Sequence, residues 1–137
     1  MRRFSWLVCS VLVLCPLGAS LAADNPEPYP ACSQKPSEAD RKAAQGAFAA
    51  GQGSFNEGDY KTATTYWRDA YRRDCTAHAL LLNLARAYES NGEKKAAVLA
   101  LKTYLDRNPD PGQRPQIERR IENLEAQIAA GGASRVR

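Results

Sequence analysis

Apolar residues recur three and four positions apart along most of this chain, which is the spacing of one face of an α-helix. The pattern is clearest near the carboxyl end, where Ile117, Ile121, Leu124 and Ile128 follow one another at steps of four, three and four. Charged residues occupy the other faces of that segment, so it has one side to bury. The periodicity predicts an all-α protein.

Capping and breaking residues divide the pattern into five helices. Ser37 followed by Asp40 resembles a helix start with a capping box. Asp59 and Thr76 are expected to cap the second and third helices, because both side chains can accept a bond from a free backbone N–H. The five predicted helices span residues 37–56, 60–73, 77–90, 93–107 and, after the breaker at 108–112, a segment that ends at Gly131-Gly132.

Two stretches repeat the same pattern of side-chain size at a spacing of 34 positions, so that Gly58 recurs as Gly92 and Ala63 as Ala97. A fixed period of this length is typical of stacked helical hairpins. Small residues such as these alanines let two helices approach within about 8 to 10 Å. Large residues such as Trp67 are then expected to fill the layers between hairpins.

The second repeat resembles the tetratricopeptide repeat family through Leu81-x-x-Leu84-Ala85-x-x-Tyr88, Gly92, Ala97-x-x-x-Leu101-x-x-Tyr104 and Pro109. The first repeat is looser, with Ala47-x-x-Ala50-Gly51-x-x-Ser54, Gly58, Ala63-x-x-x-Trp67-x-x-Ala70, and Cys75 where the family usually has proline. Together they cover residues 44–111. The resemblance implies a tetratricopeptide-like α-solenoid of two repeats, capped by the last helix, over residues 37–130.

In tetratricopeptide proteins the first helix of each pair lines a concave groove that receives a peptide or a partner's helix. The resemblance therefore implies a partner-binding face formed by Phe48, Gln52, Phe55, Leu82, Asn83, Arg86 and Glu89. Two alternatives stay open for the phenylalanines: the segment around Tyr29 covers them, or they pack in the core.

Asn83 stands where some family members clamp the terminal carboxylate of a partner. That clamp needs lysine and asparagine where this chain has Phe48 and Gln52. The clamp is therefore incomplete, and a local bond between Asn83 and the backbone is the expected alternative.

The amino-terminal residues 1–22 have the pattern of a secretory signal peptide. Two arginines precede an apolar run over 4–14, and the small-x-small site Ser20-Leu21-Ala22 follows, with cleavage expected directly after it or one residue later. An uncleaved anchor is the alternative, although the run is short for a membrane span. Lipidation of Cys15 is disfavoured because Leu14 is not small. A periplasmic or secreted protein without an integral membrane span is expected.

Removal of the signal peptide leaves two cysteines, Cys32 and Cys75, in an oxidising compartment. An even number in a small exported domain predicts a disulfide. Redox or metal chemistry is the alternative, but the chain has no Cys-x-x-Cys spacing and one histidine, His78. Cys32 lies in a proline-rich segment, 23–36, that is expected to be an extended leader because proline removes a helix donor.

The formal charge of +4 becomes +2 when Arg2 and Arg3 leave with the signal peptide. A positive charge this small does not indicate binding to nucleic acid. No nucleophile elbow, phosphate loop or metal-ligand spacing occurs in the sequence, so no catalytic residue, cofactor or metal is expected. Residues 131–137 are expected to form a flexible tail. A non-catalytic interaction module of the bacterial cell envelope with a protein or peptide partner is predicted. The alternatives are a homodimer through Phe48, Phe55 or the last helix, and a redox or hydrolytic enzyme.

Overall fold

The computed structural model describes residues 29–108 and 112–133, and all regular secondary structure in these residues is helical. The helices are α1 (Glu38–Asn56), α2 (Tyr60–Arg73), α3 (Ala79–Ser90), α4 (Lys94–Arg107) and α5 (Arg114–Ala133). The predicted all-α class is therefore confirmed. The predicted signal peptide, the leader residues 23–28 and the tail residues 134–137 lie outside the described residues.

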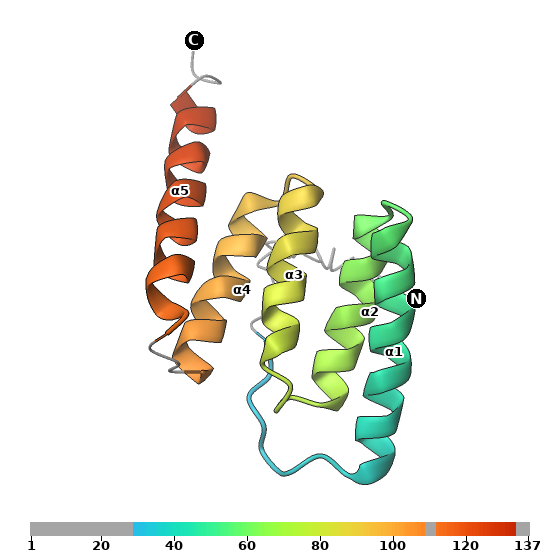
Figure 1. Ribbon diagram of the computed structural model, residues 1–137. Helices are drawn as coiled ribbons and strands as arrows, with labels where there is room; N and C mark the ends of the chain where they lie inside the picture. Colours follow the sequence, from blue (N-terminus) through green and yellow to red (C-terminus); the bar gives the residue numbers. More distant parts are fainter. Residues whose placement is uncertain (1–28, 109–111, 134–137) are drawn as a thin grey trace, which may run out of the picture.

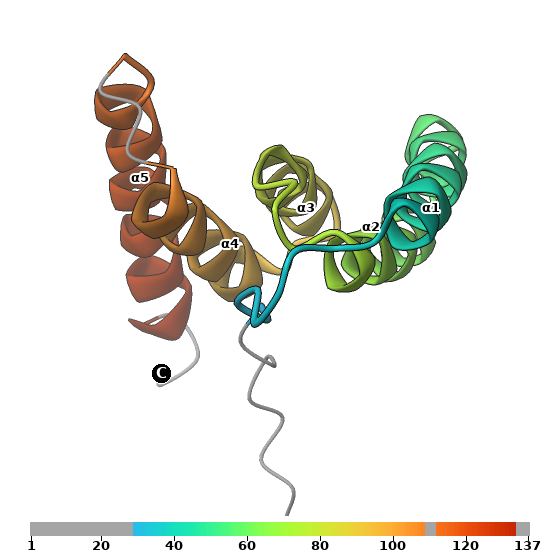
Figure 2. The same cartoon turned by 90° about the horizontal axis from the view of Figure 1, so that it is seen from below.

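Each helix packs against the next one along the chain, and short turns join α1 to α2 and α3 to α4. Figure 1 shows the resulting row of helices, with α5 at one end. From below, α1 and α3 lie on one side of the row while α2 and α4 lie on the other (Figure 2). The side formed by α1 and α3 is called the α1–α3 face from here on.

The starts of α1 and α2 follow the capping signals in the sequence. Ser37 Oγ accepts a bond of 3.1 Å from the Asp40 N–H, and the Asp40 carboxylate accepts one of 3.2 Å from the Ser37 N–H. Asp59 Oδ1 accepts a bond of 3.0 Å from the N–H of Thr62. These bonds satisfy donors that a helix start leaves free, so both predicted caps are confirmed.

Gly58 and Gly92 close the first helix of each hairpin. Their φ angles are +82° and +79°, in the left-handed region that side chains disfavour. The N–H of Glu93 then donates back to the Tyr88 carbonyl at 2.8 Å, and the equivalent bond after α1 measures 2.9 Å. Both helices thus end in a Schellman motif, which explains why glycine recurs here at the repeat spacing.

Apart from one-residue shifts at the starts of α1 and α4, two predicted boundaries differ from the structure. The Thr76 hydroxyl and N–H both bind the Asp74 carboxylate, at 2.5 and 3.1 Å, so Thr76 closes a local turn instead of capping a helix. As a result α3 begins at Ala79, two residues later than predicted. At the other end α5 continues through Gly131 and Gly132 to Ala133, since both glycines keep helical backbone angles.

The core follows the predicted pattern of small and large residues. Ala63, Ala85 and Ala97 are fully buried where neighbouring helices meet. At Gly51 a Cβ atom would lie 2.5 Å from Cδ1 of Trp67, far inside contact distance. The largest fully buried side chains are Trp67, Tyr71, Leu81, Leu84 and Leu101. Small residues therefore bring the helix backbones together, and the large ones fill the space between them.

The cysteine pair predicted from the sequence comes together in the structure. The sulfur atoms of Cys32 and Cys75 lie 1.96 Å apart, at bonding distance, and their Cα atoms lie 5.4 Å apart. The bridge joins the leader to the turn between α2 and α3, so residues 29–36 are held against the helices. Among the described helices, none has the length and apolar character needed to cross a membrane.

Candidate functional site

Phe48 is the most exposed aromatic residue of the α1–α3 face, with 39% of its surface accessible. Its ring stacks on the indole of Trp67, with centroids 6.3 Å apart. The Phe48 carbonyl also accepts a bond of 3.1 Å from Trp67 Nε1. Because Trp67 is fully buried, its indole holds the exposed ring of Phe48 in a fixed position.

Phe55 also packs against the indole of Trp67, and it links α1 to α3. Its ring is half-buried, 5.5 Å from the Trp67 ring and 5.2 Å from the Tyr60 ring between centroids. The guanidinium carbon of Arg86 lies 4.5 Å above the Phe55 centroid, within the range of a cation–π contact. The structure thus brings Phe48 and Phe55 together on one buried tryptophan, with Arg86 stacked over Phe55.

The other predicted partner-binding residues differ in what they already contact. Gln52 Nε2 donates to Asn56 Oδ1 at 3.0 Å within α1. The Glu89 carboxylate binds Arg120 of α5 at 2.7 Å, so it ties α3 to the terminal helix. Leu82 is half-buried against the core. Asn83 is also half-buried, and its amide makes no hydrogen bond to the described residues, so the expected local bond is not formed there.

The described part of the leader does not cover the two phenylalanines. Tyr29 is buried and meets the Tyr71 ring of α2 edge-on, with centroids 5.9 Å apart. Arg107, at the end of α4, donates to the Tyr29 carbonyl at 2.6 Å and to the Pro30 carbonyl at 3.0 Å. The described residues Tyr29 and Pro30 therefore dock against α2 and α4 and do not fold over Phe48, whereas residues 23–28 of the leader lie outside the described part of the chain.

Arg107 is a structural residue that the sequence analysis missed. Besides the two leader carbonyls it donates to the Tyr71 hydroxyl, and its guanidinium lies 5.6 Å from the Tyr71 ring centroid. The two residues joined by the bond to Tyr29 are 78 positions apart in the chain. Helical periodicity carries no signal for such a contact. The only available hint was Tyr29, a large aromatic in a leader otherwise poor in apolar residues.

Burial raises the pKa of the Tyr29 hydroxyl well above its ordinary value of 10.0, with a smaller contribution from neighbouring Tyr88. Burial is also the main cause of a raised pKa at Tyr88. A low-dielectric environment disfavours the phenolate form. Both hydroxyls therefore stay protonated at neutral pH and act as hydrogen-bonding groups within the packed leader.

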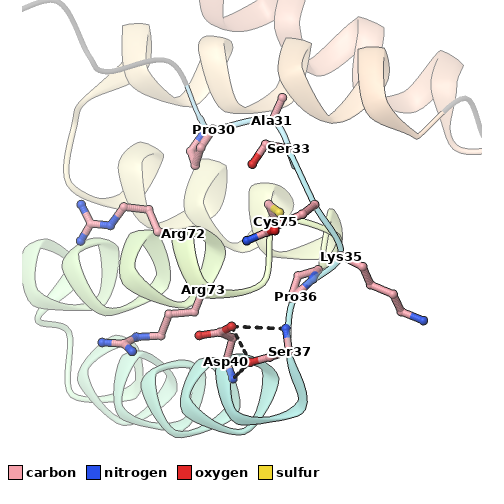
Figure 3. A pocket seen from close by; sticks show the side chains of 11 residues that line it. Pro30, Ala31, Ser33, Lys35, Pro36, Ser37, Asp40, Arg72, Arg73 and Cys75 are labelled. Atoms are coloured by element: carbon pink, nitrogen blue, oxygen red, sulfur yellow. Dashed lines mark hydrogen bonds between the residues drawn. The ribbon is translucent and has the colours of Figure 1, made fainter.

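A cavity of about 590 Å³ lies beneath the leader, between its residues 30–37 and the ends of α1 and α2 (Figure 3). Three of its four charged side chains, those of Asp40, Arg72 and Arg73 but not Lys35, are already engaged. Arg72 and Arg73 bind Asp69 at 3.6 and 2.8 Å, and Asp40 is bonded to Ser37 as a helix cap. The cavity thus presents helix-capping and surface groups rather than a set of free reactive ones.

Reactive side chains are scattered rather than gathered in the described residues. No three of their histidine, cysteine, aspartate and glutamate side chains lie close enough to share a metal ion. His78 Nδ1 lies 3.3 Å from the Tyr71 hydroxyl at the half-buried start of α3. No protein-family model and no curated protein matches this chain.

Proposed function

We propose that this chain is a non-catalytic protein-binding or assembly module of the bacterial cell envelope. In this proposal α1 to α4 are two tetratricopeptide-like hairpins, α5 caps the short array, and the α1–α3 face binds an extended or helical segment of a partner. The repeat of residue sizes over 34 positions and the succession of two tightly joined helix pairs support it. The predicted signal peptide and the bridged cysteines support a place in the periplasm or outside the cell.

The observation that carries the proposal is the exposure of Phe48. A phenylalanine with 39% of its surface accessible has no structural need to face solvent, and the cation of Arg86 lies over the ring of Phe55 on the same helix α1. Aromatic and arginine side chains contribute most of the binding energy at protein interfaces. Because Trp67 already fixes the Phe48 ring, little side-chain entropy remains to be lost on binding.

The test is a comparison of variants in affinity capture from envelope extracts, with the mature chain as bait. Phe48→Glu/Arg86→Glu places two acids on the α1–α3 face. Tyr66→Glu is the matched control, because Tyr66 is an equally exposed aromatic, 40% accessible, on α2. Proteins retained by the wild type and the control but lost by the double variant support the proposal. Equal capture by all three baits contradicts it.

Self-association is the second candidate, and the exposed Phe48 ring favours this residue as its contact point. The last helix is a poorer choice, because it already packs on α4, to which Glu125 is tied by an ion pair with Lys102 at 2.7 Å. Light scattering at micromolar concentration separates the two proposals. A dimer that becomes monomeric on Phe48→Glu substitution would favour self-association, whereas a monomeric wild type leaves the face open to another protein.

A further inference from the structure

A second cavity, of about 910 Å³, lies away from the α1–α3 face, where the amino ends of α2 and α4 meet the carboxyl end of α5. Four cationic side chains and one acidic side chain line it: Lys61, Arg68, Lys94, Lys95 and Glu93. The whole chain has a formal charge of +4, so these residues concentrate a large part of its excess positive charge in one place.

The charge of Lys61 helps to lower the pKa of the nearby Asp59 carboxyl, but none of the three lysines makes a close ion pair in the described part of the chain. Lys61, Lys94 and Lys95 form no ion pair with any residue of 29–108 or 112–133. The only acid on the cavity wall, Glu93, is hydrogen bonded to the Asn91 amide. Four cationic side chains against one carboxylate leave the cavity wall with a formal excess of three positive charges.

The position of these lysines is unfavourable for the helices that carry them. Lys61 lies in the first turn of α2, Lys94 and Lys95 open α4, and neither helix has an acidic residue in its first turn. The amino end of a helix already carries partial positive charge, so cations are disfavoured there. The acidic N-cap residues Asp59 and Glu93 offset part of this charge, and an anion bound among the lysines would offset the rest.

The rest of the wall adds hydrogen-bonding and apolar groups. The nearly buried Tyr88 lines the cavity beside Arg68, and its raised pKa keeps the hydroxyl protonated. Ile128, half-buried on α5, contributes apolar surface on the opposite side. A ligand for this cavity would carry negative charge at one end and apolar groups at the other.

We propose that this cavity binds a small anion with two or more negative charges, either a phosphate compound or a polycarboxylate. The lysines of α2 and α4 neutralise its charge from two sides, and the α5 side accepts its apolar part. Tyr88 is the lining residue that comes from α3, and none of the predicted partner-binding residues lines the cavity, so the site does not depend on the function proposed for the α1–α3 face.

The experiment is an NMR titration of the mature chain with pyrophosphate and, separately, with citrate at low ionic strength. Saturable shifts are expected in the amide signals of Gly92, Lys94 and Gly131, which belong to the cavity, while those of Gly46 and Gly53 on α1 stay in place. Raising the salt concentration should weaken binding, because free ions screen exposed charges. A response to only one ligand identifies the anion class. No saturable shift with either ligand overturns the proposal.

Charge-matched variants decide whether the cavity itself is responsible. Lys94→Gln/Lys95→Gln should bind the same ligand roughly tenfold more weakly. Lys35→Gln/Lys42→Gln removes the same charge elsewhere and should bind like the wild type. Thermal melts verify folding, and the cavity variant should be at least as stable as the wild type because it removes cations from a helix start. Equal weakening in both variants would show a general effect of net charge and overturn the site.

Discussion

At the scale of single residues, the close approach of α1 and α2 depends on the absence of a side chain at Gly51. The indole of Trp67 occupies the space that a Cβ atom would need, and it is anchored there by its bond to the Phe48 carbonyl. One glycine therefore allows the tryptophan to be fully buried, and the tryptophan in turn supports the exposed ring of Phe48 and the half-buried ring of Phe55.

Substitution of Gly51 by alanine should consequently lower stability. The new methyl group would lie 2.5 Å from Trp67 Cδ1, so the indole or the helix must move, at a cost of about 1 to 3 kcal/mol. Gly46→Ala is the control, since its Cβ would meet no atom within 4 Å and alanine favours a helix. Chemical denaturation should show a loss for Gly51→Ala and no loss for Gly46→Ala; a gain for both would refute the packing explanation.

The helix caps make stability depend on acid pH. Hydrogen bonds from Ser37 and from Thr62 hold the pKa of Asp40 and of Asp59 below the ordinary value of 3.8. A carboxyl whose pKa is lowered by folding stabilises the protein at pH values above its pKa in the unfolded chain. This contribution is lost as the pH falls through the pKa in the folded protein. The melting temperature should therefore drop as pH is lowered below about 4. Asp40→Asn/Asp59→Asn should reduce this dependence, and an unchanged profile would contradict it.

At the scale of helices and turns, the sequence was sufficient wherever a local signal decides the outcome. The caps at Ser37 and Asp59 and the left-handed glycines act within four or five residues, so α1 and α2 have the predicted bounds to within one residue. Thr76 was misassigned because Asp74 competes for its hydroxyl and N–H. Whether Thr76 caps a helix or bonds to Asp74 depends on the path of the chain after α2, which periodicity does not describe.

Prediction from the sequence was weakest where elements distant in the chain meet. It placed Phe48 and Phe55 on one face, yet it could not tell which of them Trp67 and Arg86 would partly enclose. The docking of the leader by Arg107 and the basic cavity were also missed. Both join segments that carry no common motif, and only the packing of the helices brings them together.

The role of Arg107 in holding the leader can be tested by a conservative substitution. Arg107→Lys keeps the charge but cannot bind two carbonyls and the Tyr71 hydroxyl at once, since an ammonium group lacks the planar fork of a guanidinium. A loss of about 1 to 2 kcal/mol in unfolding free energy is expected. Arg119→Lys, an exposed position on α5, is the control. Equal stability of both variants would show that the disulfide alone holds the leader.

At the scale of the whole molecule, five helices provide a small core, and the ends of the array bury little apolar surface. Arrays of helical hairpins usually need about three repeats for stability, because each unit buries its apolar side on a neighbour. Here α5 covers one end, where Ile117, Ile121 and Leu124 are buried. At the other end, no helix of the described residues other than α2 packs extensively on α1, so the link from the leader to the α2–α3 turn is the main additional constraint.

The disulfide should therefore make a large contribution to stability. It connects residues 43 positions apart across the whole first hairpin. Closing a loop of that length lowers the entropy of the unfolded chain and is expected to stabilise the folded protein by up to about 4 kcal/mol. Reducing agent should lower the melting temperature of the mature protein, and Cys32→Ser/Cys75→Ser should show the same loss without reductant. Adding reductant to that variant should have no further effect, which separates the bridge from other actions of the reagent. Free thiols in the purified protein, or equal melting temperatures with and without the bridge, would show that helix packing alone stabilises this short array.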